Sequence, residues 1–170
     1  MGAVLFDVGA GRAEAFGLTP PASLSEALVR DTGSDQVIAQ LELLPVLLAL
    51  RRWPAAFRNA GRRCLVFIDN DSARHALIKG FSPVRASRLI VEATWAELAL
   101  LQAAAWFTRV CTDGNCADGP SRLQFDALRA LPMPAVRVDP PACAAGLRSL
   151  ARGGGESAGR PAPGPHGRGG

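Results

Sequence analysis

The sequence predicts an α/β domain in which helices flank a mixed β-sheet. Apolar runs of strand length occur at residues 2–6, 13–17, 64–68 and 103–110, and longer segments with helical spacing of apolar residues lie between them. Alternation of strands and helices along one chain is typical of α/β domains. The chain has 170 residues, 48% of them hydrophobic, which is enough for one domain with a buried core.

The chain begins with a predicted β-hairpin. Residues 2–6 (GAVLF) and 13–17 (AEAFG) are short apolar runs separated by Asp7 and two glycines, a pattern that predicts two strands joined by a turn. Residues 18–35 contain two prolines and a glycine. We expect them to form a connector with a short helix over 23–30.

A buried helix and a central strand form the middle of the predicted domain. The sequence QVIAQLELLPVLLALRRW at 36–53 is apolar on nearly every side, which predicts a buried helix, bent at Pro45. The run CLVFI at 64–68 is continuously apolar and ends at Asp69. This pattern predicts a central strand that is covered on both faces.

The remaining elements are expected in the order helix, helix, strand, helix. We expect a short helix capped by Asp71 or Ser72, a longer helix over about 82–101, a last strand at 103–110 and a terminal helix at 120–131. The tryptophans are expected to lie in the core: Trp53, Trp95 and Trp106.

The predicted domain covers residues 1–135, and residues 136–170 are expected to be a disordered tail rich in Gly, Pro and Arg. The formal charge of the chain is +4. Residues 140–170 contain four arginines and one glutamate, so 4 − 1 = +3 belongs to the tail and +1 to the rest. The positive charge therefore does not by itself indicate a nucleic-acid-binding surface on the domain.

Composition also argues against a zinc site and a membrane anchor. The four cysteines form no CxxC pair and have no histidine at metal-ligand spacing. The first dozen residues include Asp7 and Arg12, and no apolar run approaches the roughly 18 residues that a membrane helix needs. We therefore expect an intracellular protein, cytoplasmic or nuclear, that is not secreted and has no membrane partner.

Glu42 is the most informative single residue, because it lies in the predicted buried helix. Its helical neighbours at i−4, i−1, i+3 and i+4 are all apolar: Ile38, Leu41, Pro45 and Val46. A buried carboxylate without a partner would cost several kcal/mol. Glu42 should therefore face a cation, a hydrogen-bond donor or a crevice, and an internal salt bridge to an arginine is the alternative to a functional site.

Two aspartates lie where a folded α/β domain presents ligand groups. Asp69 follows the apolar strand at its carboxyl end, although Asp69, Asn70 and Asp71 are also a plausible helix-capping cluster. Asp118 precedes the predicted terminal helix, where a carboxylate also suits the positive end of the helix dipole. Each aspartate alone is compatible with a purely structural role.

Together, Glu42, Asp69 and Asp118 predict a metal site. Clustered carboxylates repel one another and persist mainly where divalent cations hold them. All-oxygen ligands favour Mg²⁺ or Mn²⁺ over zinc, and a pair of such ions can activate water for phosphodiester cleavage. The arginines at 51, 52, 58, 62 and 63 could contact phosphates, but a role at the helix end and on the solvated surface is the stronger interpretation.

Three segments of the chain resemble a known family. IAQLELLPVLLALRRW, CLVFIDNDSARHALIKG and WFTRVCTDGNCADGPSRL are similar to parts of the ribonuclease H domain that follows reverse transcriptase in gypsy-like and DIRS-type retroelements. The resemblance covers residues 2–131. It includes the glutamate of the ELL helix, the aspartate after the VFI strand and the N-x-x-D-x-x-S-R motif around Asp118.

The resemblance implies a ribonuclease H-like fold and a two-metal nuclease site. Glu42, Asp69 and Asp118 would join a first aspartate on an opening strand, bind two Mg²⁺ or Mn²⁺ ions, and hydrolyse the RNA of an RNA–DNA hybrid. GAVLF matches the family's second strand, so we expect the first strand and its aspartate to lie upstream of Met1, with an upstream polymerase domain as a further partner. In an alternative register Asp7, 35 residues before Glu42, takes the place of that aspartate.

Three functions follow from the sequence. The first is a metal-dependent ribonuclease H, and the second is a catalytically inactive remnant of that domain with at most weak nucleic-acid binding. The third is a small α/β interaction module with an arginine-bearing tail. The three-acid series argues against the third function, and the missing first aspartate favours the second over the first.

Overall fold

The computed structural model describes residues 1–58 and 63–141. Most of the expected tail, from residue 142 onwards, lies outside the described residues, as does Arg62 of the arginine-rich segment. The described part is a mixed α/β fold, as the sequence predicts. None of its helices is long and apolar enough to cross a membrane.

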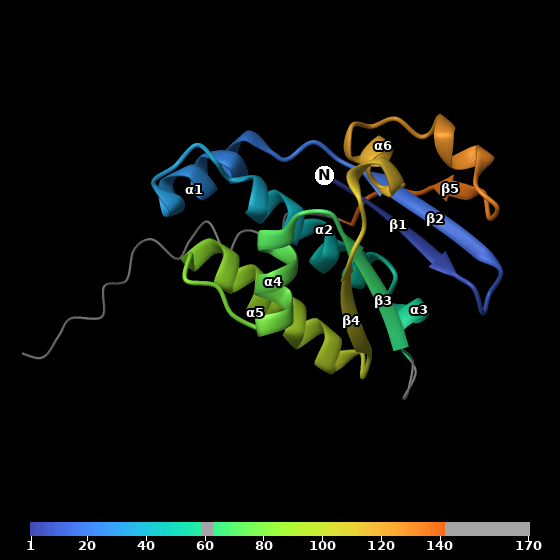
Figure 1. The fold of residues 1–170 in the computed structure, drawn as a ribbon, viewed down its shortest axis with the longest axis horizontal. Coiled ribbons are helices and arrows are strands. Elements are labelled where there is room, and N and C mark those ends of the chain that lie inside the picture. Colours follow the sequence, from blue (N-terminus) through green and yellow to red (C-terminus); the bar gives the residue numbers. More distant parts are fainter. Residues whose placement is uncertain (59–62, 142–170) are drawn as a thin grey trace, which may run out of the picture.

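The described strands form two separate sheets (Figure 1). In the first, β1 (Gly2–Asp7) pairs antiparallel with β2 (Arg12–Gly17), and β2 pairs parallel with β5 (Ala135–Arg137). In the second, β3 (Arg63–Ile68) pairs parallel with β4 (Ala104–Arg109). Within the described residues no hydrogen-bonded ladder joins β1 to β3, so the predicted mixed sheet is divided at this point.

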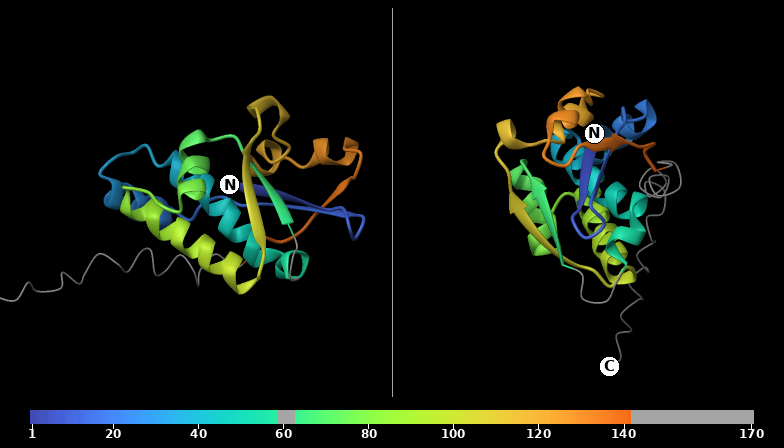
Figure 2. Two further views of the ribbon diagram at one scale, coloured as in Figure 1. Left: turned by 60° about the horizontal axis from the view of Figure 1, so that its bottom comes forward. Right: turned by 90° about the vertical axis from the view of Figure 1, so that its right-hand side faces the viewer.

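The α-helices are α1 (Ala22–Thr32), α2 (Ile38–Arg52), α3 (Pro54–Phe57), α4 (Asp71–Lys79), α5 (Arg85–Leu100) and α6 (Asp118–Ser121). Helix α2 packs against β1, α4 packs against β3 and β4, and the short helix α6 lies on the β1–β2 hairpin (Figure 2). Short 3₁₀ turns lie at Thr112–Gly114 and Asp126–Ala130. The predicted hairpin, connector helix, buried helix and the strands at 64–68 and 103–110 are confirmed within a few residues.

Helix α2 supplies the core beneath both sheets. Leu43, Leu44 and Leu47, each at most 1% exposed, belong to the larger hydrophobic cluster with α4 and α5. Leu48 instead packs with Phe16 and Trp53 under β1 and β2. Because leucines occupy nearly every side of α2, one helix buries apolar surface against both halves of the fold. The prediction of a buried helix is confirmed.

The second sheet is less covered than predicted. Leu65 and Phe67 of β3 are 66% and 59% exposed, so the expected burial of this strand on both faces is wrong for the described structure. Side chains of a strand alternate between faces, and the described helices cover only the face that bears Val66 and Ile68. Trp106 is 71% exposed on β4 and Trp95 is half exposed, whereas Trp53 lies in the core as predicted.

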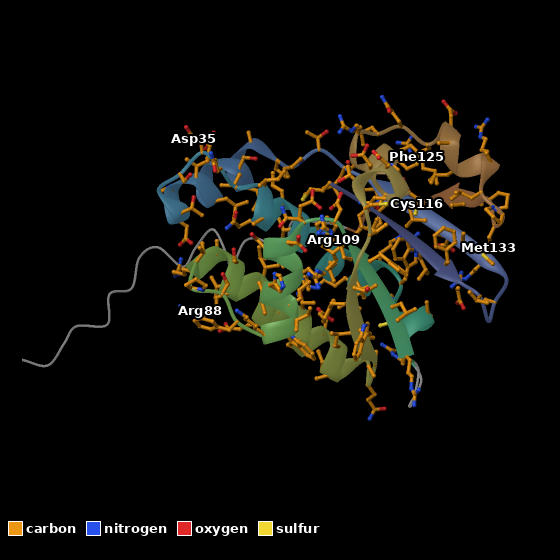
Figure 3. All side chains as sticks on the ribbon, viewed as in Figure 1. Asp35, Arg88, Arg109, Cys116, Phe125 and Met133 are labelled. Atoms are coloured by element: carbon orange, nitrogen blue, oxygen red, sulfur yellow. The ribbon has the colours of Figure 1, made fainter. Side chains whose placement is uncertain are left out.

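The start of α4 differs from the prediction in its cap. The Asn70 side chain accepts a hydrogen bond of 2.9 Å from the Ala73 amide and caps the helix, in place of Asp71 or Ser72. Asp71 instead pairs with Arg74 at 3.0 Å and with Arg109 at 3.1 Å; Arg109 is labelled in Figure 3. These two arginines hold the pKa of the exposed Asp71 carboxyl below its usual value, mainly through the Arg74 hydrogen bond.

The region after β4 also differs from the prediction. The expected helix at 120–131 is wrong, because the chain leaves α6 through Leu123, which has a left-handed backbone with φ of 63°. The strand at 103–110 is not the last, since β5 pairs with β2 and the Val138 amide donates to the Ala15 carbonyl at 2.8 Å. The ordered domain therefore continues past the expected boundary at residue 135.

Two paired glycines bring α6 close to the hairpin. Gly2 and Gly17 are partners in the β1–β2 ladder and lie on the face opposite Ala3 and Phe16. A Cβ atom on Gly2 would lie 2.6 Å from the Ser121 amide nitrogen, and one on Gly17 would overlap the Pro120 carbonyl oxygen. The absence of side chains at these positions lets the α6 backbone rest on the strands and places its first residue, Asp118.

Gly17→Ala is therefore expected to lower the free energy of unfolding by about 2 kcal/mol or more, because α6 must move away from the strands. Urea denaturation followed by circular dichroism measures this difference. The matched control is Gly9→Ala in the hairpin turn, where a Cβ would meet only Asp7 Oδ1 at 3.7 Å. Equal stability of the two variants would contradict the close packing of α6.

Candidate functional site

Three acidic residues from distant segments line one small pocket of about 240 Å³. Glu42 comes from the second turn of α2, Asp69 follows the last residue of β3, and Asp118 is the first residue of α6. The fold thus brings together the three carboxylates that the sequence singles out. The pocket also includes Met1 and Asn115.

Glu42 is the electrostatic centre of this group. It is half-buried, and its burial raises the pKa of the carboxyl group. The negative charges of Asp69 and Asp118 raise this pKa further. In the described residues no arginine pairs with Glu42, so the alternative of an internal arginine salt bridge does not explain it.

The amino group of Met1 places a positive charge that acts on Glu42. This group donates hydrogen bonds to the carbonyls of Leu18 at 3.1 Å and Ser121 at 3.3 Å. Burial lowers the pKa of the amino group, and the Glu42 charge acts in the opposite direction. In turn the amino group partly offsets the repulsion at Glu42.

Asn115 fixes Asp69 and the loop after β4. Its Nδ2 atom donates to Asp69 Oδ2 at 3.0 Å, and its Oδ1 atom accepts from the Ala117 amide at 3.0 Å. The Asn115 carbonyl oxygen also accepts from the Asp118 amide at 3.0 Å. Sequence reasoning noted this asparagine in the N-x-x-D-x-x-S-R motif but assigned it no contact.

Arg122 holds the Asp118 carboxylate. Its Nε atom lies 3.2 Å from Oδ1 and 3.1 Å from Oδ2, across one helical turn at the protein surface. Ser121 Oγ donates to the Asp118 carbonyl at 2.7 Å and closes the same turn. A cation that binds Asp118 must therefore compete with Arg122, an exposed partner whose own contribution is small.

Asp7 lies at the end of β1 that is far from the acidic pocket. Its Oδ1 atom accepts from the Ala10 amide at 3.2 Å in the hairpin turn, and Arg12 Nε lies 3.8 Å from its Oδ2. Gly2, at the other end of the strand, lines the acidic pocket. Five residue steps of about 3.3 Å separate the two ends by about 17 Å. The alternative register therefore does not bring Asp7 to the three acids.

The donor atoms suit a hard divalent cation. Carboxylate and amide oxygens are ligands for Mg²⁺ and Mn²⁺. A bound cation would offset both the burial of Glu42 and the nearby negative charges, which together raise the pKa of this residue. In the described ranges, however, no three His, Cys, Asp or Glu side chains form a ready group of metal ligands. Asn115 and Arg122 instead occupy oxygens of Asp69 and Asp118.

The two arginines at the end of α2 have structural contacts. Arg51 Nε lies 2.6 Å from Glu97 on α5, and Arg52 Nε donates to the Asp139 carbonyl at 2.8 Å. These contacts fit the interpretation of the arginines as helix-end and surface residues. They leave the carboxylate pocket as the stronger candidate site.

Glu42→Gln is expected to raise the midpoint of thermal unfolding by a few degrees in EDTA at neutral pH. A neutral amide removes the cost of holding a charged carboxylate half-buried near Asp69 and Asp118. Scanning fluorimetry measures the midpoint, with Glu26→Gln on the exposed side of α1 as the matched control. A lower midpoint for Glu42→Gln alone would show that Glu42 is a stabilising partner and not a repelled one.

Comparison of the chain with protein-family models, with curated proteins and with solved structures gives no match. The chemistry of the pocket therefore has to be inferred from its own residues. These are three interacting carboxylates with an amide and an arginine beside them, at the carboxyl end of β3.

Proposed function

We propose that Glu42, Asp69 and Asp118 bind divalent cations and that the chain is a ribonuclease H-like domain that hydrolyses the RNA strand of RNA–DNA hybrids. The observation that carries the proposal is the shared pocket of these three acids. Burial raises the pKa of Glu42 in this pocket, and the charges of Asp69 and Asp118 act in the same direction. Separate structural roles for the acids do not require that they meet.

The order of elements supports the ribonuclease H-like assignment. An antiparallel hairpin, a buried helix that carries the glutamate, and a strand that ends in an aspartate follow one another along the chain. The third acid opens a helix after the next parallel strand. This sequence of elements matches the segments by which the chain resembles the retroelement ribonuclease H family.

Each residue of the pocket has a defined part in the proposed chemistry. The three carboxylates would hold the cations, and Asn115 would orient Asp69 through its 3.0 Å hydrogen bond. Bound Mg²⁺ or Mn²⁺ would supply an activated water and stabilise the charge of the leaving oxygen. Arg122 would exchange Asp118 for a phosphate of the substrate, since guanidinium groups bind both anions.

One observation favours the alternative of an inactive remnant. Asp7, the candidate for a fourth acid, lies at the end of β1 that is far from the pocket. An inactive remnant would keep the fold and bind nucleic acid weakly at most. Metal binding and hydrolysis therefore need separate measurements.

Metal binding is tested by thermal unfolding. Millimolar Mn²⁺ or Mg²⁺ is expected to raise the unfolding midpoint of the wild-type chain, because a ligand that binds only the folded state stabilises it by RT ln(1 + [L]/Kd). Asp69→Asn should abolish most of this rise, and Asp71→Asn, an exposed aspartate two residues away, should retain it. A rise that is the same in all three proteins would place the cation elsewhere.

Hydrolysis is tested with a labelled RNA–DNA hybrid and Mn²⁺ or Mg²⁺. Cleavage of the RNA strand is expected from the wild-type chain and from Asp71→Asn, with a loss of at least 100-fold in Asp69→Asn and complete loss in EDTA. Cleavage that survives Asp69→Asn would identify a contaminating nuclease. A folded, metal-binding chain that cleaves nothing would support the inactive remnant.

A further inference from the structure

Arg122 is an exposed arginine at the rim of the acidic pocket. Its side chain is 67% exposed, and the residues that line the pocket include Asp118 and Ser121 but not Arg122. Its backbone amide donates to the carbonyl of Gly119 at 2.9 Å, so Arg122 closes the helical turn that Asp118 begins. Arg122 therefore reaches the Asp118 carboxylate from the solvent side of the pocket.

The contact engages both carboxylate oxygens of Asp118. Arg122 Nε lies 3.2 Å from Oδ1 and 3.1 Å from Oδ2. Among the described residues, no arginine or lysine forms an ion pair with Glu42 or Asp69. Arg122 thus acts on the pocket through one of its three acids, and it does so on the atoms that would bind a cation.

The positive charge of Arg122 opposes a divalent cation at Asp118. Oxygen ligands lie about 2.1 Å from Mg²⁺, so a cation on either Asp118 oxygen would lie at most about 5 Å from Arg122 Nε as it is now placed. Like charges at this distance repel each other at a protein surface. The cation affinity of the pocket is therefore lower while Arg122 holds Asp118.

A phosphate group of a polynucleotide removes this opposition. Guanidinium groups bind phosphate and carboxylate with the same fork of N–H donors. The pair of Arg122 and Asp118 is exposed and joins residues four apart, and such pairs are weak, so a phosphate can displace the Asp118 carboxylate. The displacement frees both Asp118 oxygens and places a further negative charge beside the pocket.

We propose that Arg122 couples the binding of a divalent cation in the acidic pocket to the binding of a nucleic-acid phosphate. Without nucleic acid, Arg122 holds Asp118 and weakens cation binding. When a phosphate binds Arg122, Asp118 is released and the cation binds more tightly. Such coupling is reciprocal, so the cation strengthens nucleic-acid binding by the same factor. The inference rests on the proposed function, from which the identity of both ligands is taken.

The first experiment measures Mn²⁺ binding to the full chain without nucleic acid, by isothermal titration calorimetry. Arg122→Ala is expected to bind Mn²⁺ about three- to tenfold more tightly than the wild-type chain, because the competing positive charge is gone. A purely structural role of Arg122 predicts weaker binding, since loss of its contact would loosen Asp118. The matched control is Arg129→Ala, which removes an exposed arginine outside the pocket and should leave the affinity unchanged.

The second experiment measures the affinity for a fluorescent RNA–DNA hybrid whose RNA strand carries 2′-O-methyl groups to prevent cleavage. Anisotropy gives the dissociation constant in Mn²⁺ and in EDTA. Mn²⁺ should strengthen hybrid binding at least threefold more in the wild-type chain than in Arg122→Ala. In EDTA, Asp118→Asn should bind the hybrid more tightly than the wild-type chain, because it frees Arg122 for a phosphate. Asp126→Asn, which removes an exposed charge outside the pocket, should bind less tightly than Asp118→Asn.

The outcomes separate the coupling from the cation site itself. Mn²⁺ binding by the wild-type chain that is equal or weaker in a folded Arg122→Ala chain overturns the coupling and leaves the proposed cation site in place. If neither the wild-type chain nor the two arginine variants bind Mn²⁺, the coupling and the proposed function are both wrong. Thermal unfolding verifies that each variant folds, and Arg122→Gln, which keeps a side-chain donor near Asp118, replaces an alanine variant that does not.

Discussion

The fold depends on helix α2, because this helix holds together two sheets that share no hydrogen-bonded ladder in the described chain. Its leucines pack into the cluster with α4 and α5 on one side and into the cluster with Phe16 and Trp53 on the other. Trp53 Nε1 also donates to Glu14 of β2 at 2.7 Å, which ties the end of the helix to the hairpin. The relative position of the sheets is therefore set by side-chain packing, and a cavity remains where their edges face each other.

The same helix connects the architecture to the acidic pocket. Glu42 lies on the side of α2 that faces the end of β3, and the Gly2–Gly17 pair lets α6 approach close enough to bring Asp118 to it. A carboxylate half-buried among like charges costs stability in the absence of a cation. That cost is a physical reason to connect the pocket with a divalent ion and not with packing alone.

Sequence reasoning predicts the elements that have a strong local pattern. The leucine-rich helix, the hairpin and the three acids are identified from spacing alone, because burial of α2 and the ends of β3 and α6 are encoded by neighbouring residues. Sequence reasoning fails where contacts between residues far apart in the chain determine the local structure. β5 has only three residues and forms because β2 offers a free edge. The helix expected at 120–131 already ends at Ser121, and Leu123 then has a left-handed backbone.

The exposure of β3 is a further example. The run CLVFI has the composition of a strand buried on both faces, yet Leu65 and Phe67 are largely exposed. The local sequence pattern indicates that the strand is suited to burial on both faces. The structure shows that the described residues cover only one of these faces. The contact of Asn115 with Asp69 was likewise beyond local reasoning, because 46 residues separate the two side chains.

The most direct test of the central claim is a titration of ¹⁵N-labelled protein with substoichiometric Mn²⁺, followed by paramagnetic broadening of amide signals. If the three acids form one cation site, signals of residues 41–43, 68–70 and 116–119 broaden together at the same Mn²⁺ concentration. Broadening confined to one of these segments, or strongest near other exposed acids such as Asp35, would show that the three carboxylates do not act as one site.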